Sequence, residues 1–130
     1  MGIYTFQLGS DILKKELNLI QIFEKNAIKQ HEALEKGNAR IANKCFNNLN
    51  SIIKELYKNK ELETLKILLS HNNINVRCQA AIALLIVEPE RAEKELEKIS
   101  LCVGLKTGTI AGIAKMTLQE WRKGNIKFDY

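Results

Sequence analysis

The residues best equipped for nucleophilic, acid–base or metal chemistry are two histidines and three cysteines. An active site or zinc site needs such groups to converge, and a spacing such as Cys-x-x-Cys is its usual signature. Cys45, Cys78 and Cys102 are far apart, and neither His31 nor His71 stands at a motif spacing from a serine or cysteine. The sequence therefore predicts no enzyme, no disulfide framework, no metal site and no cofactor. Each cysteine is expected to be a small buried hydrophobic residue.

The segment 104–109 resembles part of a phosphate-binding loop. It places Lys106 and Thr107 between Gly104 and Gly108, with Thr109 directly after them, just before a predicted helix. Backbone N–H groups at a helix N-terminus can bind phosphate. However, the segment lacks the residue order of the GxxxxGK[ST] motif, and no strand is predicted before it. We therefore expect a plain loop between two helices.

A run of glutamates is the most distinctive charged feature that the sequence predicts for the surface. On a helix that begins near Pro89, side chains at spacings of three and four residues share one side. The acidic strip is defined by Glu88, Glu90, Glu93 and Glu97. It can be a solvated face neutralised by Lys94 and Lys98, or a docking site for a basic partner such as the cationic cleft of a nuclease.

The net charge of +5 and the pI of about 9.1 permit an anionic partner without requiring one. Residues 1–59 carry +3, residues 60–100 carry −1 and residues 101–130 carry +3. The alternative binding set for phosphate groups is Lys25, Lys29, Lys36 and Arg40. Glutamates are interleaved with these cations in the sequence, and such mixing weakens the field that a nucleic acid would meet.

Apolar residues recur at helical spacing along most of the chain, which predicts an all-α fold. The first long helix is expected to start at a cap formed by Ser10 or Asp11 and to stop at Gly37. A second helix, capped by Asn38, continues to Leu56, so the two form an antiparallel hairpin. Its predicted buried stripe comprises Ile41, Cys45, Leu49, Ile52, Ile53 and Leu56.

Four further helices are predicted after residue 60. A short leucine-rich helix spans residues 62–69, and a very apolar helix, capped by Asn75, spans residues 76–87 at the centre of the core. Pro89 suits the first turn of the next helix, because its missing N–H would be unsatisfied there anyway. The last helix spans residues 110–121, with Trp121 as a core anchor, and ends at Gly124.

The length of 130 residues suits one domain, with short tails at residues 1–9 and 125–130. The longest apolar run, residues 80–87, is far shorter than the roughly 18 residues of a membrane span. The first residues lack the basic and apolar regions of a signal peptide, so we expect a cytoplasmic protein with no membrane contact. The sequence does not determine the oligomeric state.

The segment 68–81, LLSHNNINVRCQAA, resembles the turn of a HEAT repeat. That consensus runs from a Leu-Leu helix end through a turn into Val-Arg-x-x-Ala-Ala, with small residues where two helices cross. Arg77 is then expected to bond to groups of the adjacent turn. Asn72, Asn73 and Asn75 replace the usual acidic and proline turn residues.

Residues 12–125 as a whole resemble a small bacterial family of HEAT-like helical domains without an assigned activity. The resemblance implies a HEAT/armadillo-like α-α superhelix of about six helices in antiparallel hairpins. Similar proteins occur as immunity proteins beside polymorphic or contact-dependent growth inhibition toxins. The resemblance therefore implies a non-enzymatic domain that binds and blocks a cognate toxin, for example a nuclease. A nucleic-acid-binding module that uses the basic ends of the chain is the alternative.

Overall fold

The computed structural model describes residues 2–104 and 107–128, with side chains described from residue 17 onwards. This part of the chain is all helical and contains no strand, which confirms the predicted fold class. The six helices are α1 (Gly2–Glu35), α2 (Ala39–Lys58), η1 (Leu62–Ser70), α3 (Ile74–Leu84), α4 (Pro89–Ser100) and α5 (Gly108–Arg122), of which η1 is a 3-10 helix.

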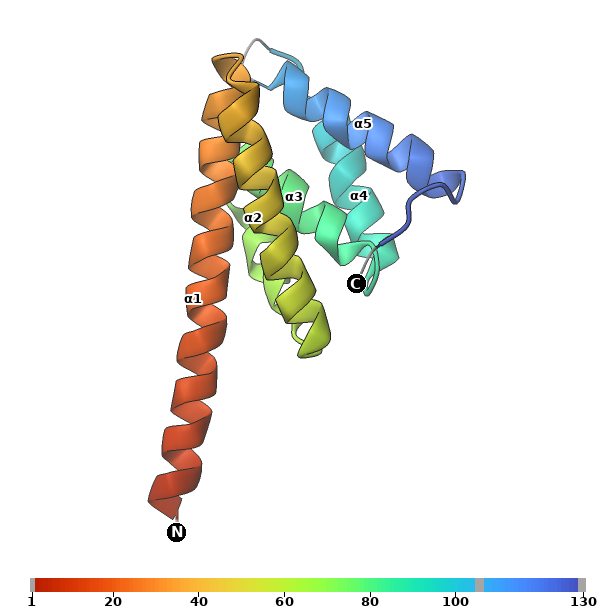
Figure 1. Ribbon diagram of the computed structural model, residues 1–130. Helices are drawn as coiled ribbons and strands as arrows, with labels where there is room; N and C mark the ends of the chain where they lie inside the picture. Colours follow the sequence, from red (N-terminus) through yellow and green to blue (C-terminus); the bar gives the residue numbers. More distant parts are fainter. Residues whose placement is uncertain (1, 105–106, 129–130) are drawn as a thin grey trace.

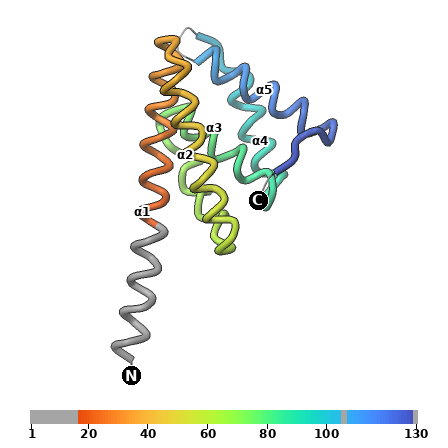
Figure 2. Tube along the Cα trace, viewed as in Figure 1, coloured from red at the N-terminus to blue at the C-terminus, as the bar shows by residue number. Residues whose placement is uncertain are grey.

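Successive helices pack as hairpins, α1 with α2, η1 with α3, and α4 with α5 (Figure 1). Helix α3 contacts η1, α4, α1 and α5, so it lies at the centre of the domain. The tube in Figure 2 shows α2 returning alongside the upper part of α1, and α5 crossing in front of α4. The hairpin arrangement predicted from the sequence is therefore present.

The start of the first helix differs from the prediction. Helix α1 begins at Gly2, so Ser10 and Asp11 are not caps and residues 2–9 are not a tail. Capping stabilises these residue types only where a helix begins. Inside a helix, serine and aspartate cost less than about 1 kcal/mol each relative to alanine, and no proline interrupts residues 2–11. Once a helix has nucleated, each further residue adds a hydrogen bond.

The turn between α1 and α2 follows the predicted chemistry. Gly37 has a φ of +70°, a conformation that glycine adopts without a steric penalty. The Oδ1 atom of Asn38 then accepts a hydrogen bond of 3.2 Å from the N–H of Ile41 and caps α2. On α2 the predicted stripe is buried apart from Ile41, which is partly exposed; Ala42 is buried one residue further on.

The cap of α3 is Asn73 and not Asn75, which corrects the sequence prediction. Asn73 Oδ1 accepts hydrogen bonds from the N–H groups of Asn75 (2.8 Å) and Val76 (3.2 Å). Because Ile74 is the first helical residue, only the side chain before it can reach the free N–H groups of the first turn. Asn75 is instead fully buried and serves the core, as described below.

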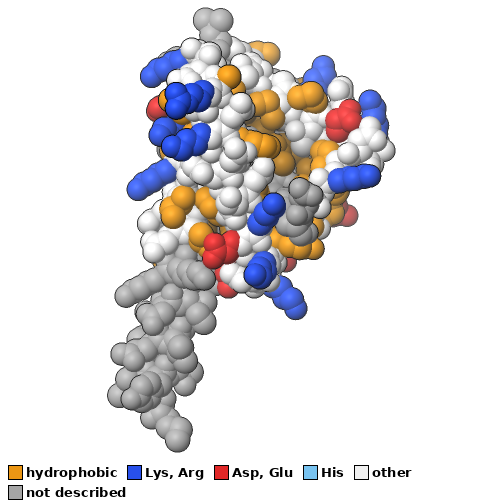
Figure 3. Space-filling view, in the orientation of Figure 1, with side chains coloured by type: hydrophobic (Ala, Val, Ile, Leu, Met, Phe, Trp, Pro, Cys, Tyr) orange, Lys and Arg blue, Asp and Glu red, His pale blue; other side chains and the backbone are white. Residues whose placement is uncertain are grey.

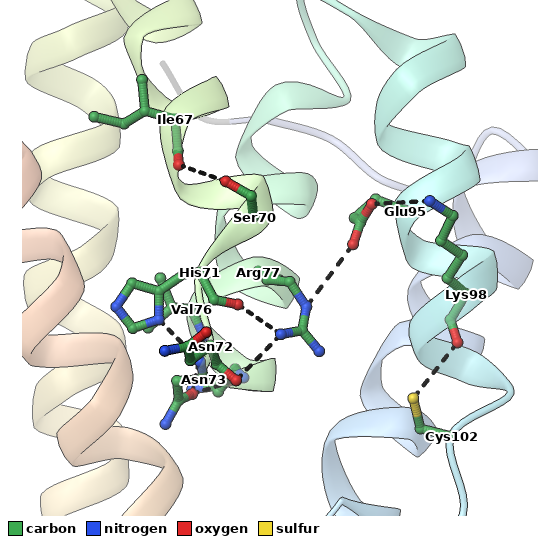
Figure 4. Close-up of polar contacts among 11 residues, drawn as sticks. Ile67, Ser70, His71, Asn72, Asn73, Val76, Arg77, Glu95, Lys98 and Cys102 are labelled. Atoms are coloured by element: carbon green, nitrogen blue, oxygen red, sulfur yellow. Dashed lines mark hydrogen bonds and ion pairs between the residues drawn. The ribbon is translucent and has the colours of Figure 1, made fainter.

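Arg77 ties the turn before α3 to its own helix, as the HEAT-like pattern implies (Figure 4). Its Nη1 group donates to the backbone oxygens of His71 (2.6 Å) and Asn72 (3.2 Å). Its Nε atom lies 3.9 Å from Glu95 Oε1 on α4. Arg77 therefore links the turn, α3 and α4.

The core is centred on α3, where Val76, Cys78, Ala80, Ala81 and Ala83 are fully buried. The small side chains let neighbouring helices approach closely. Burial raises the pKa of the Cys78 thiol from 9.0 to about 12. The helix ends at Leu84, three residues before the predicted end, and residues 85–87 form a turn.

Two predictions about single core residues are only partly right. Cys45 and Cys78 are buried as expected, whereas Cys102 is partly exposed in the connection after α4. Trp121 packs against the core from its edge and remains partly exposed. Its ring centroid lies 6.1 Å from that of Phe128, so the segment after α5 covers part of the indole.

Candidate binding groove

A groove of about 470 Å³ opens between α2, α3, α5 and the segment that follows α5. Figure 3 shows apolar side chains gathered in this hollow between the surfaces of α2 and α5. The apolar part of the groove lining comprises Phe46, Ile53, Ile82, Ile113, Ile126 and Phe128. Phe46 remains 48% exposed, although a large aromatic side chain gains free energy by leaving water. Phe46 is therefore an apolar side chain of the groove that a ligand or partner could still cover.

Helical periodicity places the lining residues on one side of each helix. On α2, Phe46, Asn50 and Ile53 recur at steps of four and three residues. On α5, Ile113 and Thr117 are one turn apart. Ile53 belongs to the buried stripe of α2, whereas Phe46 and Asn50 lie beside it, so the groove is lined by the edge of the core and by the adjoining side of the helix. The three hairpins together build a site that no single helix contains.

A buried amide network supports the floor of the groove. The Nδ2 group of Asn75 donates to the backbone oxygen of Ala27 and to Gln30 Oε1, both at 2.8 Å. Gln79 Nε2 donates to Asn75 Oδ1 at 3.4 Å. Gln30 and Gln79 also line the groove. Among the described residues, Gln30 Nε2 and Gln79 Oε1 have no hydrogen-bond partner. The Nε2 group can therefore donate to an occupant, and the Oε1 atom can accept from it.

The charged residues of the lining are both cationic. Lys54 of α2 and Lys127 of the last segment are exposed at the groove, and its described lining contains no aspartate or glutamate. A negatively charged occupant would therefore meet favourable charge on both sides. Apolar walls, an amide floor and two lysines fit an acidic segment that carries apolar side chains.

The predicted acidic strip is largely neutralised within the chain. Glu88 accepts a hydrogen bond of 2.8 Å from Lys66 Nζ. Arg122 Nε lies 3.5 Å from Glu93 Oε1, and Arg122 Nη2 hydrogen-bonds to Glu97. Glu90 is the one member without an ion pair among the described residues. Three of the four carboxylates thus already have partners, which lowers the strip's attraction for a basic protein.

The alternative phosphate-binding set is exposed at one end of the α1–α2 hairpin. Lys25 and Lys29 project from α1, Lys36 lies in the turn directly after it, and Arg40 lies in the first turn of α2. Two of the interleaved glutamates are held by histidines. His71 Nε2 lies 3.0 Å from Glu24 Oε1, and His31 Nε2 lies 3.2 Å from Glu35 Oε1.

The loop that resembles a phosphate-binding segment lies partly outside the described residues, because Leu105 and Lys106 are not described. Gly108 and Thr109 belong to α5 and not to the loop, since the N–H of Ala111 donates to Thr107 O at 2.8 Å and continues the helix. No strand precedes the loop in the described chain.

The described residues contain neither a metal site nor a membrane span. No group of three or more His, Cys, Asp or Glu side chains is placed to hold a metal ion. None of the helices in this part of the chain combines the length and apolar character that crossing a bilayer requires.

Helical periodicity alone does not indicate the groove, because its lining comes from helices that meet only in the fold: Ile53 belongs to the predicted stripe of α2, whereas Phe46 lies beside it. Phe46 follows the buried Cys45 by one residue and so falls off the core side of α2. An aromatic residue placed beside a buried stripe is the one local signal that could have indicated the site.

Comparisons with known proteins support the fold without assigning an activity. The model of a family described as "Domain of unknown function (DUF2019)" matches residues 17–121. The chain is similar to the crystal structure of the protein RPA1889 from Rhodopseudomonas palustris CGA009, with 29% sequence identity and a TM-score of 0.74. The similarity covers 85% of this chain and 91% of that chain. No curated protein matches the sequence.

Proposed function

This chain belongs to the DUF2019 family, and we propose that it is a non-enzymatic domain that binds a partner protein through the groove between α2, α3 and α5. The observation that carries the proposal is the composition of the groove. Apolar side chains, the two glutamine amides that each keep one unbonded end, and two lysines converge there from separate parts of the chain. We infer that the occupant is an acidic segment of the partner, anchored by one or two apolar side chains.

The size of the groove suits such an anchor. A volume of about 470 Å³ lies within the range of roughly 300–1,000 Å³ found for small-ligand pockets, enough for one or two large side chains. Burying an apolar anchor against Phe46 and Ile113 would contribute about 2 kcal/mol for each large side chain. Gln30 and Gln79 would bond to the backbone of the segment, and the two lysines would select for acidic residues.

The finer proposal is that the chain is a cytoplasmic immunity protein and that the partner is a bacterial toxin domain. Support for it comes from the resemblance of residues 12–125 to HEAT-like immunity proteins. Inhibition would be stoichiometric, because a rigid helical surface that covers a toxin's active site or substrate groove needs no chemistry of its own. The neutralised acidic strip favours the groove over that strip as the contact surface.

The direct test begins with the genes adjacent to this chain's gene, one of which the proposal expects to encode a toxin-like domain, and titrates that domain calorimetrically with this chain. We expect a 1:1 complex that the double variant Phe46→Ala/Ile113→Ala weakens at least tenfold. Met116→Ala is the matched control, because Met116 lies on α5 outside the groove lining and is 59% exposed.

Two results would contradict the proposal. The first is a complex that the groove variant leaves unchanged. The second is a complex lost only when Glu90, Glu93 and Glu97 are changed to lysine, since that result would return the contact to the acidic strip.

A further inference from the structure

Positive charge is concentrated in residues 25–60, which include the last third of α1, the turn after it and α2. Residues 25–60 contain eight Lys and Arg residues and three Glu residues. Their net charge of +5 equals that of the whole chain, so the charges elsewhere balance one another. Figure 3 shows Lys and Arg side chains gathered over the end of the α1–α2 hairpin, on the left of the view.

Five of these cations form what we call the basic face: Lys25, Lys29, Lys36, Arg40 and Lys44. All five are exposed, and none has an ion pair among the described residues. By contrast, Lys66 and Arg122 on the other hairpins are paired with glutamates. Glu24 and Glu35 are held by histidines, so Glu32 is the one carboxylate of residues 24–44 without such a partner in the described chain. The charge of the basic face is therefore available to a ligand.

The basic face contains a cavity of about 510 Å³ between α1 and α2. Lys29, Arg40 and Lys44 stand around it, and Asn26 and Asn48 lie between them. Asn48 Nδ2 donates to Asn26 Oδ1 at 3.0 Å, which joins the two helices across the cavity. Arg40 and Lys44 are one turn apart, which corresponds to about 6 Å along the helix axis.

We propose that the basic face binds the phosphate backbone of a nucleic acid, independently of the groove. Cations on two adjacent helices can contact successive phosphates, and the asparagine amides can bond to phosphate or sugar oxygens. The described residues that line the cavity include no aromatic side chain to stack with a base. Binding should therefore depend strongly on salt and little on base sequence. A membrane surface is the less suitable partner, because the described cavity lining offers only one large aliphatic side chain, that of Ile41, for insertion.

The test uses fluorescence anisotropy with a labelled 20-nucleotide single-stranded RNA at several salt concentrations. We expect the triple variant Lys29→Gln/Arg40→Gln/Lys44→Gln to bind at least tenfold more weakly at 100 mM salt. Because each lost phosphate contact changes the log–log salt slope by about 0.7 for a single strand, that slope should become shallower by about two.

The control variant is Arg91→Gln/Lys94→Gln/Lys115→Gln, which removes the same charge from exposed, unpaired sites outside the hairpin. We expect it to change the affinity less than threefold. Circular dichroism will show whether each variant is folded, and single substitutions at Arg40 and Lys44 replace any triple variant that is not. Equal losses in the two triple variants, or no RNA binding by the parent chain, would overturn the proposal. Binding to vesicles containing 30% phosphatidylserine, with none to RNA, would also overturn it.

Discussion

The turn between η1 and α3 predicts a steep order of stability among three asparagine variants. Asn75 is fully buried and makes two hydrogen bonds of 2.8 Å, to Ala27 O and Gln30 Oε1. A neutral hydrogen bond contributes about 1 kcal/mol, and an acceptor left unpaired costs about another 1 kcal/mol. Asn75→Ala should therefore lower the free energy of unfolding by about 3 kcal/mol, or the melting temperature by about 12 °C at about 4 °C per kcal/mol.

The neighbouring asparagines provide the controls. Asn73→Ala removes the cap of α3 and should cost about 1 kcal/mol. Asn72 is exposed, and its contribution to the turn is a backbone oxygen that accepts from Arg77, so Asn72→Ala should cost less than about 0.5 kcal/mol. Urea unfolding followed by circular dichroism gives all three values. If Asn75→Ala cost no more than Asn73→Ala, the assignment of a structural amide network to the groove floor would be wrong.

Four further predictions concern individual side chains. Arg122→Ala should cost less than about 1 kcal/mol, because its ion pairs are half exposed, and thermal melts in 1 M salt should show a smaller loss still. At pH 8 a thiol reagent should label Cys102 in the native protein and Cys78 only in urea; labelling of native Cys78 would contradict its burial. Because burial raises the pKa of the Cys78 thiol, the folded state keeps this proton at pH values where the unfolded state has lost it. The stability of the protein relative to Cys78→Ala should therefore fall as pH rises from 9.0 to about 12. Phe128→Ala should shift Trp121 fluorescence to longer wavelength, and an unchanged spectrum would contradict the ring contact.

Local rules of helix formation are enough to predict most of the helices and the turns between them. The stripe from Cys45 to Leu56, the glycine at position 37 and the proline at position 89 each act within a few residues, so they can be read from one chain. The cap of α3 was misplaced by two residues because three asparagines stand in the same turn. The sequence does not show which of them lies directly before the first helical residue.

The candidate sites depended on contacts between distant residues. Glu88 pairs with a lysine 22 residues away, and Glu97 pairs with an arginine 25 residues away. The negative charge of the acidic strip, which the sequence leaves available to a partner, is therefore largely neutralised in the fold. The groove likewise forms only because α2, α3 and α5 meet where they do. Helical periodicity predicts which side of a helix is apolar, but it does not predict which other helix packs against that side.

The most direct test of the proposed function is site-specific photo-crosslinking from position 46. The chain would carry a benzophenone amino acid in place of Phe46, or in place of Met116 as the control, and would be mixed with the purified partner domain used in the calorimetric titration. We expect crosslinks from position 46 alone, and mass spectrometry should identify an acidic peptide with apolar side chains. Crosslinks from position 116 without any from position 46 would contradict binding in the groove.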